Sequence, residues 1–210
     1  MGSLGVLALW ALAGFVIMRF VVNINGPGEL PTAAFLASGS GRILDMGAGT
    51  GRSTLMVLEG RPKTTVVAID SFAESYDRHF GKGVTGLIAE NLRAADMDGR
   101  AEVRTADMRE LPFGAGEFDG IISVAAIDHL SSTGIQKALG EAARVCKPGG
   151  EFLLMVVNND VYGKLAFGPL LAHGGTRPAA RWVSWLGEAG FDVTERGEKP
   201  IMSYFLARRR

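Results

Sequence analysis

The chain has 210 residues, enough for one domain with a full hydrophobic core and too few for two domains of ordinary size. Lysine plus arginine and aspartate plus glutamate are equal at 22 each, so no overall positive charge attracts nucleic acid and no such partner is expected. The single cysteine, Cys146, excludes an internal disulfide framework and a metal site built from several cysteines.

Residues 4–24 are almost continuously apolar, with Arg19 as their only charge. A helix of this length reaches about 30 Å, the thickness of the hydrocarbon layer of a membrane. Arg19 lies off centre and can extend toward the lipid headgroups. We therefore expect residues 1–24 to form a single-pass membrane anchor, with the rest of the chain on the cytoplasmic side. A helix packed on the domain and a cleaved signal peptide are the alternatives.

Residues 25–41 contain glycine, proline and serine clusters, which are typical of a linker. From residue 42 to residue 210, short apolar runs alternate with amphipathic helical stretches. Strands are expected at 43–46, 65–69, 101–105, 118–124, 151–157, 191–194 and 201–207, and helices at 52–58, 84–97, 135–145 and 181–189. This alternation predicts one α/β domain with a mostly parallel sheet that helices cover on both faces.

The most informative segment joins the first expected strand to the first expected helix. Gly47, Gly49 and Gly51 alternate after Asp45, and glycine lets the backbone turn sharply and approach a ligand closely. A dinucleotide fingerprint would need its third glycine three residues after the second, where Arg52 stands instead. The spacing therefore argues against a nicotinamide-dependent oxidoreductase.

Polar residues follow the next two strands, at the edge where parallel sheets bind ligands. Asp70 and Ser71 follow the second strand, where a carboxylate can accept hydrogen bonds from both hydroxyls of a ribose. Asp107 and Met108 follow the third, where a carboxylate can accept from an adenine amino group while the methionine packs on the ring. The alternatives are a helix N-cap for Asp70 and ordinary turn chemistry for Asp107.

Three stretches resemble a known family. The glycine loop resembles the cofactor loop of class I S-adenosylmethionine (SAM) methyltransferases. Residues 107–119 resemble the D-x-x-x-L-P-F-x-x-x-x-F-D signature of the methyltransferase type 11 group. Residues 141–150 resemble its E-x-x-R-V-L-K-P-G-G turn, with Cys146 in place of the usual leucine. The resemblance extends from residue 42 to about residue 208, and it implies a Rossmann-like seven-stranded sheet, SAM as cofactor and methyl-transfer activity.

The resemblance also implies which residues bind the cofactor. Asp45 would orient the loop amides or meet the methionine end of SAM, because that end carries a sulfonium and an ammonium group and acids suit it. The expected cofactor-binding residues are Asp45, Gly47, Ala48, Gly49, Gly51, Asp70, Ser71, Asp107, Met108 and Ser123.

Asp128 and His129 follow the fourth strand and are the expected catalytic residues. Either could deprotonate a methyl acceptor or hold it in place, and methyl transfer from a sulfonium can proceed by positioning alone. A purely structural histidine is the alternative for His129. Asp128 with Asn158, Asn159 and Asp160 raises a second alternative, a metal-dependent O-methyltransferase, but the type 11 resemblance argues against it and no metal site is expected.

The acceptor is expected to be a small or lipophilic molecule at a membrane. Residues 161–172 are apolar but interrupted by glycine and proline, so they would line the acceptor pocket or enter the membrane interface, with a loop packed on the core as the alternative. Residues 76–83 would form either a plain surface loop or part of a lid over the cofactor. A catalytically silent protein of the same fold, acting as a binding partner or scaffold, is the alternative function.

Overall fold

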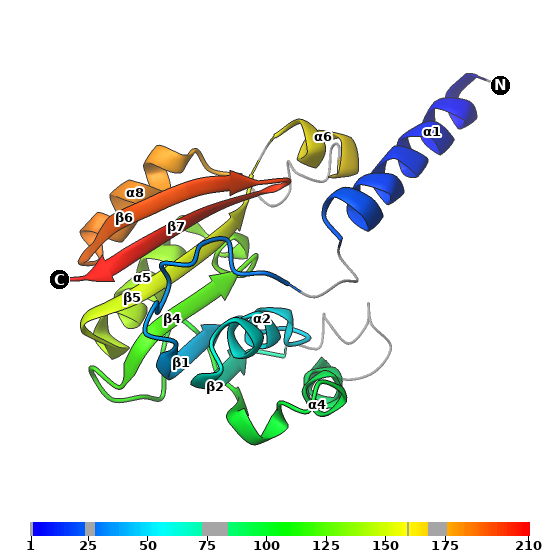
Figure 1. Cartoon of the computed structure of the whole chain (residues 1–210). Coiled ribbons are helices and arrows are strands. Elements are labelled where there is room, and N and C mark those ends of the chain that lie inside the picture. Colours follow the sequence, from blue (N-terminus) through cyan, green and yellow to red (C-terminus); the bar gives the residue numbers. More distant parts are fainter. Residues whose placement is uncertain (1, 24–27, 73–83, 159, 168–175) are drawn as a thin grey trace.

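Seven strands form one sheet in the order β3-β2-β1-β4-β5-β7-β6 (Figure 1). The computed structural model describes residues 2–23, 28–72, 84–158, 160–167 and 176–210. The expected lid (76–83), Asn159 and residues 168–172 therefore lie outside the described residues. The strands are β1 (Ser40–Met46), β2 (Lys63–Asp70), β3 (Ala101–Thr105), β4 (Phe118–Val124), β5 (Cys146–Val157), β6 (Phe191–Lys199) and β7 (Met202–Arg209).

All neighbouring strands are parallel except β7, which runs antiparallel to both β5 and β6. The predicted Rossmann-like, seven-stranded, mostly parallel sheet is confirmed. Strand β5 begins at Cys146, five residues before its predicted start, because Cys146 pairs with Phe118 across an irregularity in the β4–β5 register.

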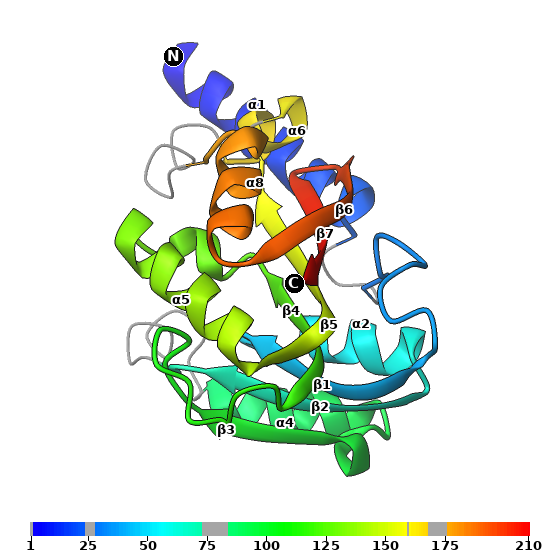
Figure 2. The same cartoon turned by 90° about the vertical axis from the view of Figure 1, so that its left-hand side faces the viewer.

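Helices cover both faces of the sheet, as its sequence pattern requires. Consecutive residues of a strand point to opposite faces, so Ile43 belongs to one buried cluster and Leu44 to the other. The first face packs on α2 (Arg52–Gly60) and α4 (Val84–Ala94), and the second on α5 (Ser132–Val145) and α8 (Ala179–Glu188). Figure 2 shows α5 and α8 on the opposite side of the sheet from α2.

The two signature stretches hold each other in place. Glu141 of α5 accepts a hydrogen bond from the Leu111 amide at 2.7 Å, and Arg144 donates to the carbonyl oxygens of Leu111 and Phe113 at 3.0 and 2.7 Å. Asp119 accepts from the Arg42 amide at 2.8 Å and from Lys147 Nζ at 2.5 Å. The acid and base residues of these motifs therefore fix the loop between β3 and β4 and the starts of β1 and β5.

The N-terminal helix differs from the sequence expectation. The α-helix α1 (Gly2–Val16) has 15 residues and continues only as a five-residue π-helix, η1 (Ile17–Val21). An α-helix of 15 residues reaches about 22 Å, which is shorter than the hydrocarbon layer. Among the described residues no helix combines the length and apolar character needed to cross a membrane, so the predicted single-pass anchor and membrane localisation are wrong.

Instead, α1 projects from the sheet and packs on α6 (Val161–Phe167) (Figure 1). A Cβ atom on Gly14 would lie only 3.2 Å from the carbonyl oxygen of Ala166, so the two backbones approach closely. Part of the predicted linker also packs on the domain, since Phe35 and Leu36 are buried and the Leu36 amide donates to Glu151 at 2.6 Å.

Candidate functional site

The candidate site lies where the strand order reverses. Strand β1 pairs with β2 on one side and with β4 on the other, and the chain leaves β1 through the glycine loop that begins α2. In open parallel sheets, ligands bind at the carboxyl ends of the strands beside such a reversal. The ends of β1, β2, β3 and β4 therefore bring together residues that are far apart in the sequence, from Gly47 to Leu130.

The positions of the loop are occupied by glycine for different structural reasons. Gly47, Gly49 and Gly51 all have positive φ, at 85°, 52° and 90°. A Cβ on Gly47 would lie 2.3 Å from the Cβ of Ala126, and one on Gly51 would lie 2.8 Å from Cγ1 of Ile88. No atom lies within 4 Å of the Cβ position of Gly49. Gly47 and Gly51 are thus required by packing, whereas Gly49 faces open space.

Asp70 holds this loop against the end of β2. Its Oδ2 accepts a hydrogen bond from the Gly49 amide and its Oδ1 accepts from the Phe72 amide, both at 3.0 Å. The Ile69 carbonyl oxygen accepts from the amides of Gly47 and Ala48 at 2.8 and 2.9 Å. Each carboxylate oxygen has a further lone pair, so Asp70 remains able to accept hydrogen bonds from a ligand.

A shallow cleft, here called the loop cleft, lies beside the glycine loop. It brings together five predicted cofactor-binding residues and four others, and it is lined by Gly47, Ile69, Asp70, Ser71, Ala106, Asp107, Met108, Arg109 and Leu130. Its two carboxylates can accept hydrogen bonds from sugar hydroxyls and an amino group, and Met108 offers an apolar surface for a ring. The predicted residues Ala48, Gly49 and Gly51 lie in the adjoining loop.

Arg109 was not predicted from the sequence. It forms a bidentate ion pair with Asp107, with Nη2 to Oδ2 at 2.6 Å and Nε to Oδ1 at 2.9 Å. These hydrogen bonds lower the pKa of Asp107 and hold its carboxylate ionised. One sequence signal could have found this pair: an arginine stands two residues after an acid that directly follows a strand.

Asp45 and Ser123, also predicted to bind the cofactor, do not line the loop cleft; their side chains are fully buried near the ends of β1 and β4. Asp45 Oδ2 accepts hydrogen bonds from the hydroxyls of Ser53 and Thr54 at 2.7 and 2.6 Å, which ties the end of β1 to the start of α2. Burial raises the pKa of Asp45 from 3.8 to about 6. The hydroxyl of Ser123 donates to the carbonyl oxygen of Met46 at 2.7 Å. Both side chains therefore fix the end of β1.

The two predicted catalytic residues lie in the short 3-10 helix η3 (Ile127–His129), beside the loop cleft. His129 is exposed, whereas Asp128 is buried. Asp128 Oδ2 accepts from the Val157 amide at 3.0 Å, and its Oδ1 is a buried oxygen without a hydrogen-bond partner in the described chain. Arg177 donates to the carbonyl oxygens of Asp128 and Leu130, both at 3.0 Å, and so fixes this segment from the other side.

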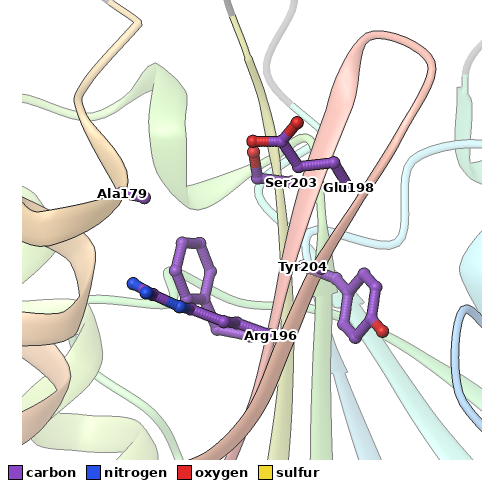
Figure 3. A pocket seen from close by; sticks show the side chains of 7 residues that line it. Ala179, Arg196, Glu198, Ser203 and Tyr204 are labelled. Carbon is purple, nitrogen blue, oxygen red and sulfur yellow. The ribbon is translucent and has the colours of Figure 1, made fainter.

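Arg177 also borders a second hollow, here called the hairpin groove. Two adjoining depressions share Ala179, Glu198 and Ser203, and together they run from the end of β5 along the β6–β7 hairpin to the start of α8. Figure 3 shows the depression along the hairpin, with Arg196, Glu198 and Tyr204 among its lining residues. The groove is lined by Asn158, Asp160, Thr176, Arg177, Pro178, Ala179, Arg196, Gly197, Glu198, Ser203, Tyr204 and Phe205. The long separation of these residues in the sequence hid the groove from sequence reasoning.

The carboxylates near the groove are engaged with the backbone. Asp160 accepts from the amides of Gly163 and Ile201 at 2.6 and 2.9 Å, and Asp128 accepts from Val157. Within the described ranges, no three histidine, cysteine, aspartate or glutamate residues converge in a way that would hold a metal ion. Asn159, part of the metal alternative, lies outside those ranges.

Two of the similar proteins are named as methyltransferases, and a third is uncharacterised. A phosphatidylethanolamine N-methyltransferase of Cereibacter sphaeroides is 28% identical over 156 residues, covering 74% of this chain and 66% of the relative. A demethylmenaquinone methyltransferase of Thermus thermophilus is 36% identical over 116 residues, covering 54% and 46%. An uncharacterised Mycobacterium bovis protein is 32% identical over 68% of this chain. The chain spans 46% of that relative's length, about half.

Solved structures agree on the fold. Mitomycin 7-O-methyltransferase superposes with a TM-score of 0.68 at 20% identity, over 85% of this chain and 51% of the other. A putative sarcosine dimethylglycine methyltransferase from Galdieria sulphuraria gives a TM-score of 0.64 at 16% identity, over 83% and 82%. A family model described as a methyltransferase domain matches residues 43–150, which include most of β1, all of β2 to β4 and every residue of the loop cleft. The chain therefore belongs to the methyltransferase domain family and has the Rossmann-like fold of its structural neighbours.

Proposed function

We propose that the chain transfers the methyl group of SAM to a small or lipophilic acceptor held beside Asp128 and His129. The observation that carries this proposal is the adjacency of the two sites: Leu130 lines the loop cleft and directly follows His129. The names of two relatives, acting on phosphatidylethanolamine and demethylmenaquinone, support a lipophilic acceptor.

The residues of the loop cleft suit the parts of SAM. Asp70 would accept hydrogen bonds from the ribose hydroxyls, and Asp107, held ionised by Arg109, would accept from the adenine amino group while Met108 packs on the ring. The open side of Gly49 would let the ligand approach the backbone. SAM supplies a methyl carbon that its positive sulfur activates toward a nucleophile.

His129 and Asp128 would act on the acceptor. His129 is exposed, so it can accept a proton from an acceptor hydroxyl or ammonium group, or hold the acceptor in line with the methyl carbon. The unpartnered Oδ1 of Asp128 would orient a donor of the acceptor or of the neighbouring histidine. Arg177 would keep both residues in position through its bonds to the Asp128 and Leu130 carbonyls.

Titration calorimetry with SAM tests the cofactor part of this proposal. We expect the full-length chain to bind SAM, and Asp70→Asn to weaken binding at least about tenfold because a charge-assisted acceptor is lost. Asp98→Asn is the matched control, since Asp98 is an exposed acid remote from the loop cleft, and it should leave the affinity unchanged. A chain that folds but does not bind SAM would contradict the proposal.

Transfer is tested separately, with SAM labelled in its methyl group and small-molecule extract as the source of acceptor. We expect a labelled product, and we expect His129→Gln to reduce its rate of formation at least about tenfold while the SAM dissociation constant stays constant. Binding of SAM with no labelled product from any extract would favour the silent scaffold instead.

A further inference from the structure

The exposed apolar side chains of this protein gather on one surface. Within the described chain, every large apolar side chain that is exposed belongs to α1, η1 or α6. We call this the α1–α6 surface; it consists of Val6, Leu7, Leu9, Leu12, Phe15, Val16, Phe20, Val21, Val161, Tyr162 and Leu165. Exposed apolar side chains concentrated on a few packed elements mark a site that binds an apolar partner or ligand.

Helix α6, which carries part of the α1–α6 surface, begins next to a residue of the hairpin groove. Asp160 lines the groove and also begins α6, because its Oδ1 accepts from the Gly163 amide and its Oδ2 accepts from the Ile201 amide in the β6–β7 turn. Val161 and Tyr162, which are exposed, therefore directly follow Asp160, a groove residue that hydrogen bonds both to α6 and to the β6–β7 turn.

The groove itself carries one charge of each sign. Arg196 and Glu198 lie on the same face of β6, and neither forms an ion pair with any described residue. Figure 3 shows the Arg196 guanidinium extended toward the start of α8, whereas the Glu198 carboxylate lies beside Ser203. A ligand group with an anion and a cation a few ångströms apart complements this pair.

We propose that the methyl acceptor is a zwitterionic amphiphile, with its charged group in the hairpin groove and its hydrocarbon chain on the α1–α6 surface. The inference rests on the proposed function and names its substrate class. Arg196 binds the anionic part of the headgroup and Glu198 the cationic part. The hydrocarbon chain covers apolar side chains that water otherwise contacts, which supplies the main driving force for binding.

Alkylphosphocholines with hexyl, octyl, decyl and dodecyl chains are suitable probes, used below their micelle-forming concentrations with the full chain. We expect the affinity to rise by roughly tenfold for every two methylenes added, as burial of a hydrocarbon chain requires. An uncharged dodecyl glycol ether should bind at least about tenfold more weakly than dodecylphosphocholine. An affinity that does not change with chain length overturns the proposal.

Substitutions test where the charged headgroup and the hydrocarbon chain of the ligand bind. Leu165→Asp should weaken dodecylphosphocholine at least about tenfold and hexylphosphocholine much less. Gln136→Asp adds the same charge to the exposed face of α5 and should change neither. Arg196→Gln with Glu198→Gln should remove the preference for the phosphocholine over the glycol ether. If Leu165→Asp fails to fold, the chain-length series and the groove variant still decide the question.

Other occupants of the α1–α6 surface give different results. Binding to phosphatidylcholine vesicles without binding to monomeric amphiphiles, or self-association that Leu165→Asp abolishes without any amphiphile binding, would overturn the proposal. Titration calorimetry with SAM on the same preparations distinguishes failure of the proposed acceptor class from failure of the proposed function. Intact SAM binding with no amphiphile binding overturns only the acceptor class, whereas loss of SAM binding overturns the proposed function.

Discussion

Gly47 and Gly49 share a positive φ but have different surroundings. A Cβ on Gly47 would meet Ala126 at 2.3 Å, whereas a Cβ on Gly49 would have no atom within 4 Å. We expect Gly47→Ala to lower the free energy of unfolding by about 2–4 kcal/mol, from backbone strain plus overpacking. Gly49→Ala should lower it by only about 1 kcal/mol but should weaken SAM binding, because its methyl group projects where the ligand approaches.

Urea unfolding and SAM calorimetry on the two variants check this contrast. The glycine motif would have a different explanation if Gly49→Ala proved the more destabilising change, or if it left the SAM affinity unaltered.

The raised pKa of Asp45 predicts how the stability of the folded protein depends on pH. Its folded-state pKa is raised to about 6 from 3.8, with burial as the largest cause. Between these two pH values the folded state binds more protons than the unfolded state, so this group's contribution to stability falls as pH rises. A carboxyl group shifted by this amount makes the folded state less stable by roughly 3 kcal/mol at pH 7.5 than at pH 3.5.

Asp45→Asn removes the titration while keeping an oxygen that can accept from Ser53 and Thr54. We expect the variant to be more stable than the natural chain at pH 7.5 and to lose that advantage near pH 4. Denaturant unfolding across this range measures it. A gap between the two proteins that is independent of pH would show that Asp45 does not titrate as its burial requires.

At the scale of single residues, the sequence predicts which side chains follow the strands, but it does not predict which distant residues contact them. Asp70, Asp107 and Asp128 could be selected because parallel strands end at a common edge. Arg177 could not, because it meets the Asp128 carbonyl from 49 residues away and no local pattern encodes that contact. The burial of Asp45 could not be predicted either, because the sequence alone does not tell whether an acid beside a glycine loop is buried or exposed.

At the scale of elements, the α5 pair of Glu141 and Arg144 joins a helix to the loop between β3 and β4. Arg144→Ala removes two hydrogen bonds to loop carbonyls and one partner of Glu141. We expect a loss of about 1–3 kcal/mol in the free energy of unfolding, because the loop carbonyls lose their charged donor. Arg93→Ala, on the exposed face of α4, should stay within about 0.5 kcal/mol.

Thermal or denaturant unfolding of both arginine variants provides the measurement. Equal effects of the two substitutions would mean that the motif residues of α5 do not hold the loop.

Periodicity predicts the elements best where both of their ends carry local signals. Strands β3 and β4 begin and end as predicted, since each is a short apolar or alternating run between polar residues. Helix α5 begins three residues earlier than predicted because Ser131 caps it, accepting from the Gly134 amide at 3.2 Å. The α6 helix was missed because Gly163 and the residues that follow it suggest an interrupted segment, while its stability depends on packing against α1.

At the scale of the whole molecule, the N-terminal segment is separable from the cofactor site. Helix α1 and η1 pack mainly on α6, and the exposed hydrogen bond from Arg52 Nη2 to the Asn23 carbonyl oxygen, at 3.2 Å, links the end of the segment to the start of α2. We expect a chain that lacks residues 1–23 to bind SAM within about twofold of the full chain, since no loop-cleft residue is removed. The same truncation should weaken dodecylphosphocholine, because much of the α1–α6 surface is lost.

Calorimetry on the truncated chain with both ligands checks this separation. A large loss of SAM affinity would show instead that the N-terminal helix supports the cofactor site.

The overall architecture was predictable because alternating strands and helices leave few ways to bury both faces of a parallel sheet. The function of the first apolar helix was not, since hydropathy alone does not distinguish a spanning helix from one that ends early and packs on a neighbour. That distinction depends on where the α-helix ends, at Val16, and on the close approach of Gly14 to Ala166.

The sheet order has an evolutionary consequence. The residues beside the donor lie between positions 47 and 130, on strands that run in one direction, and the family match ends at residue 150. The groove residues all lie between 158 and 205, and half of them belong to a hairpin whose second strand runs the opposite way. On the proposed function, insertions or substitutions in that hairpin would change the molecule that is modified without disturbing the half of the chain that would bind the donor. Diversification of such enzymes can therefore proceed in one half of the gene while the other half is held constant.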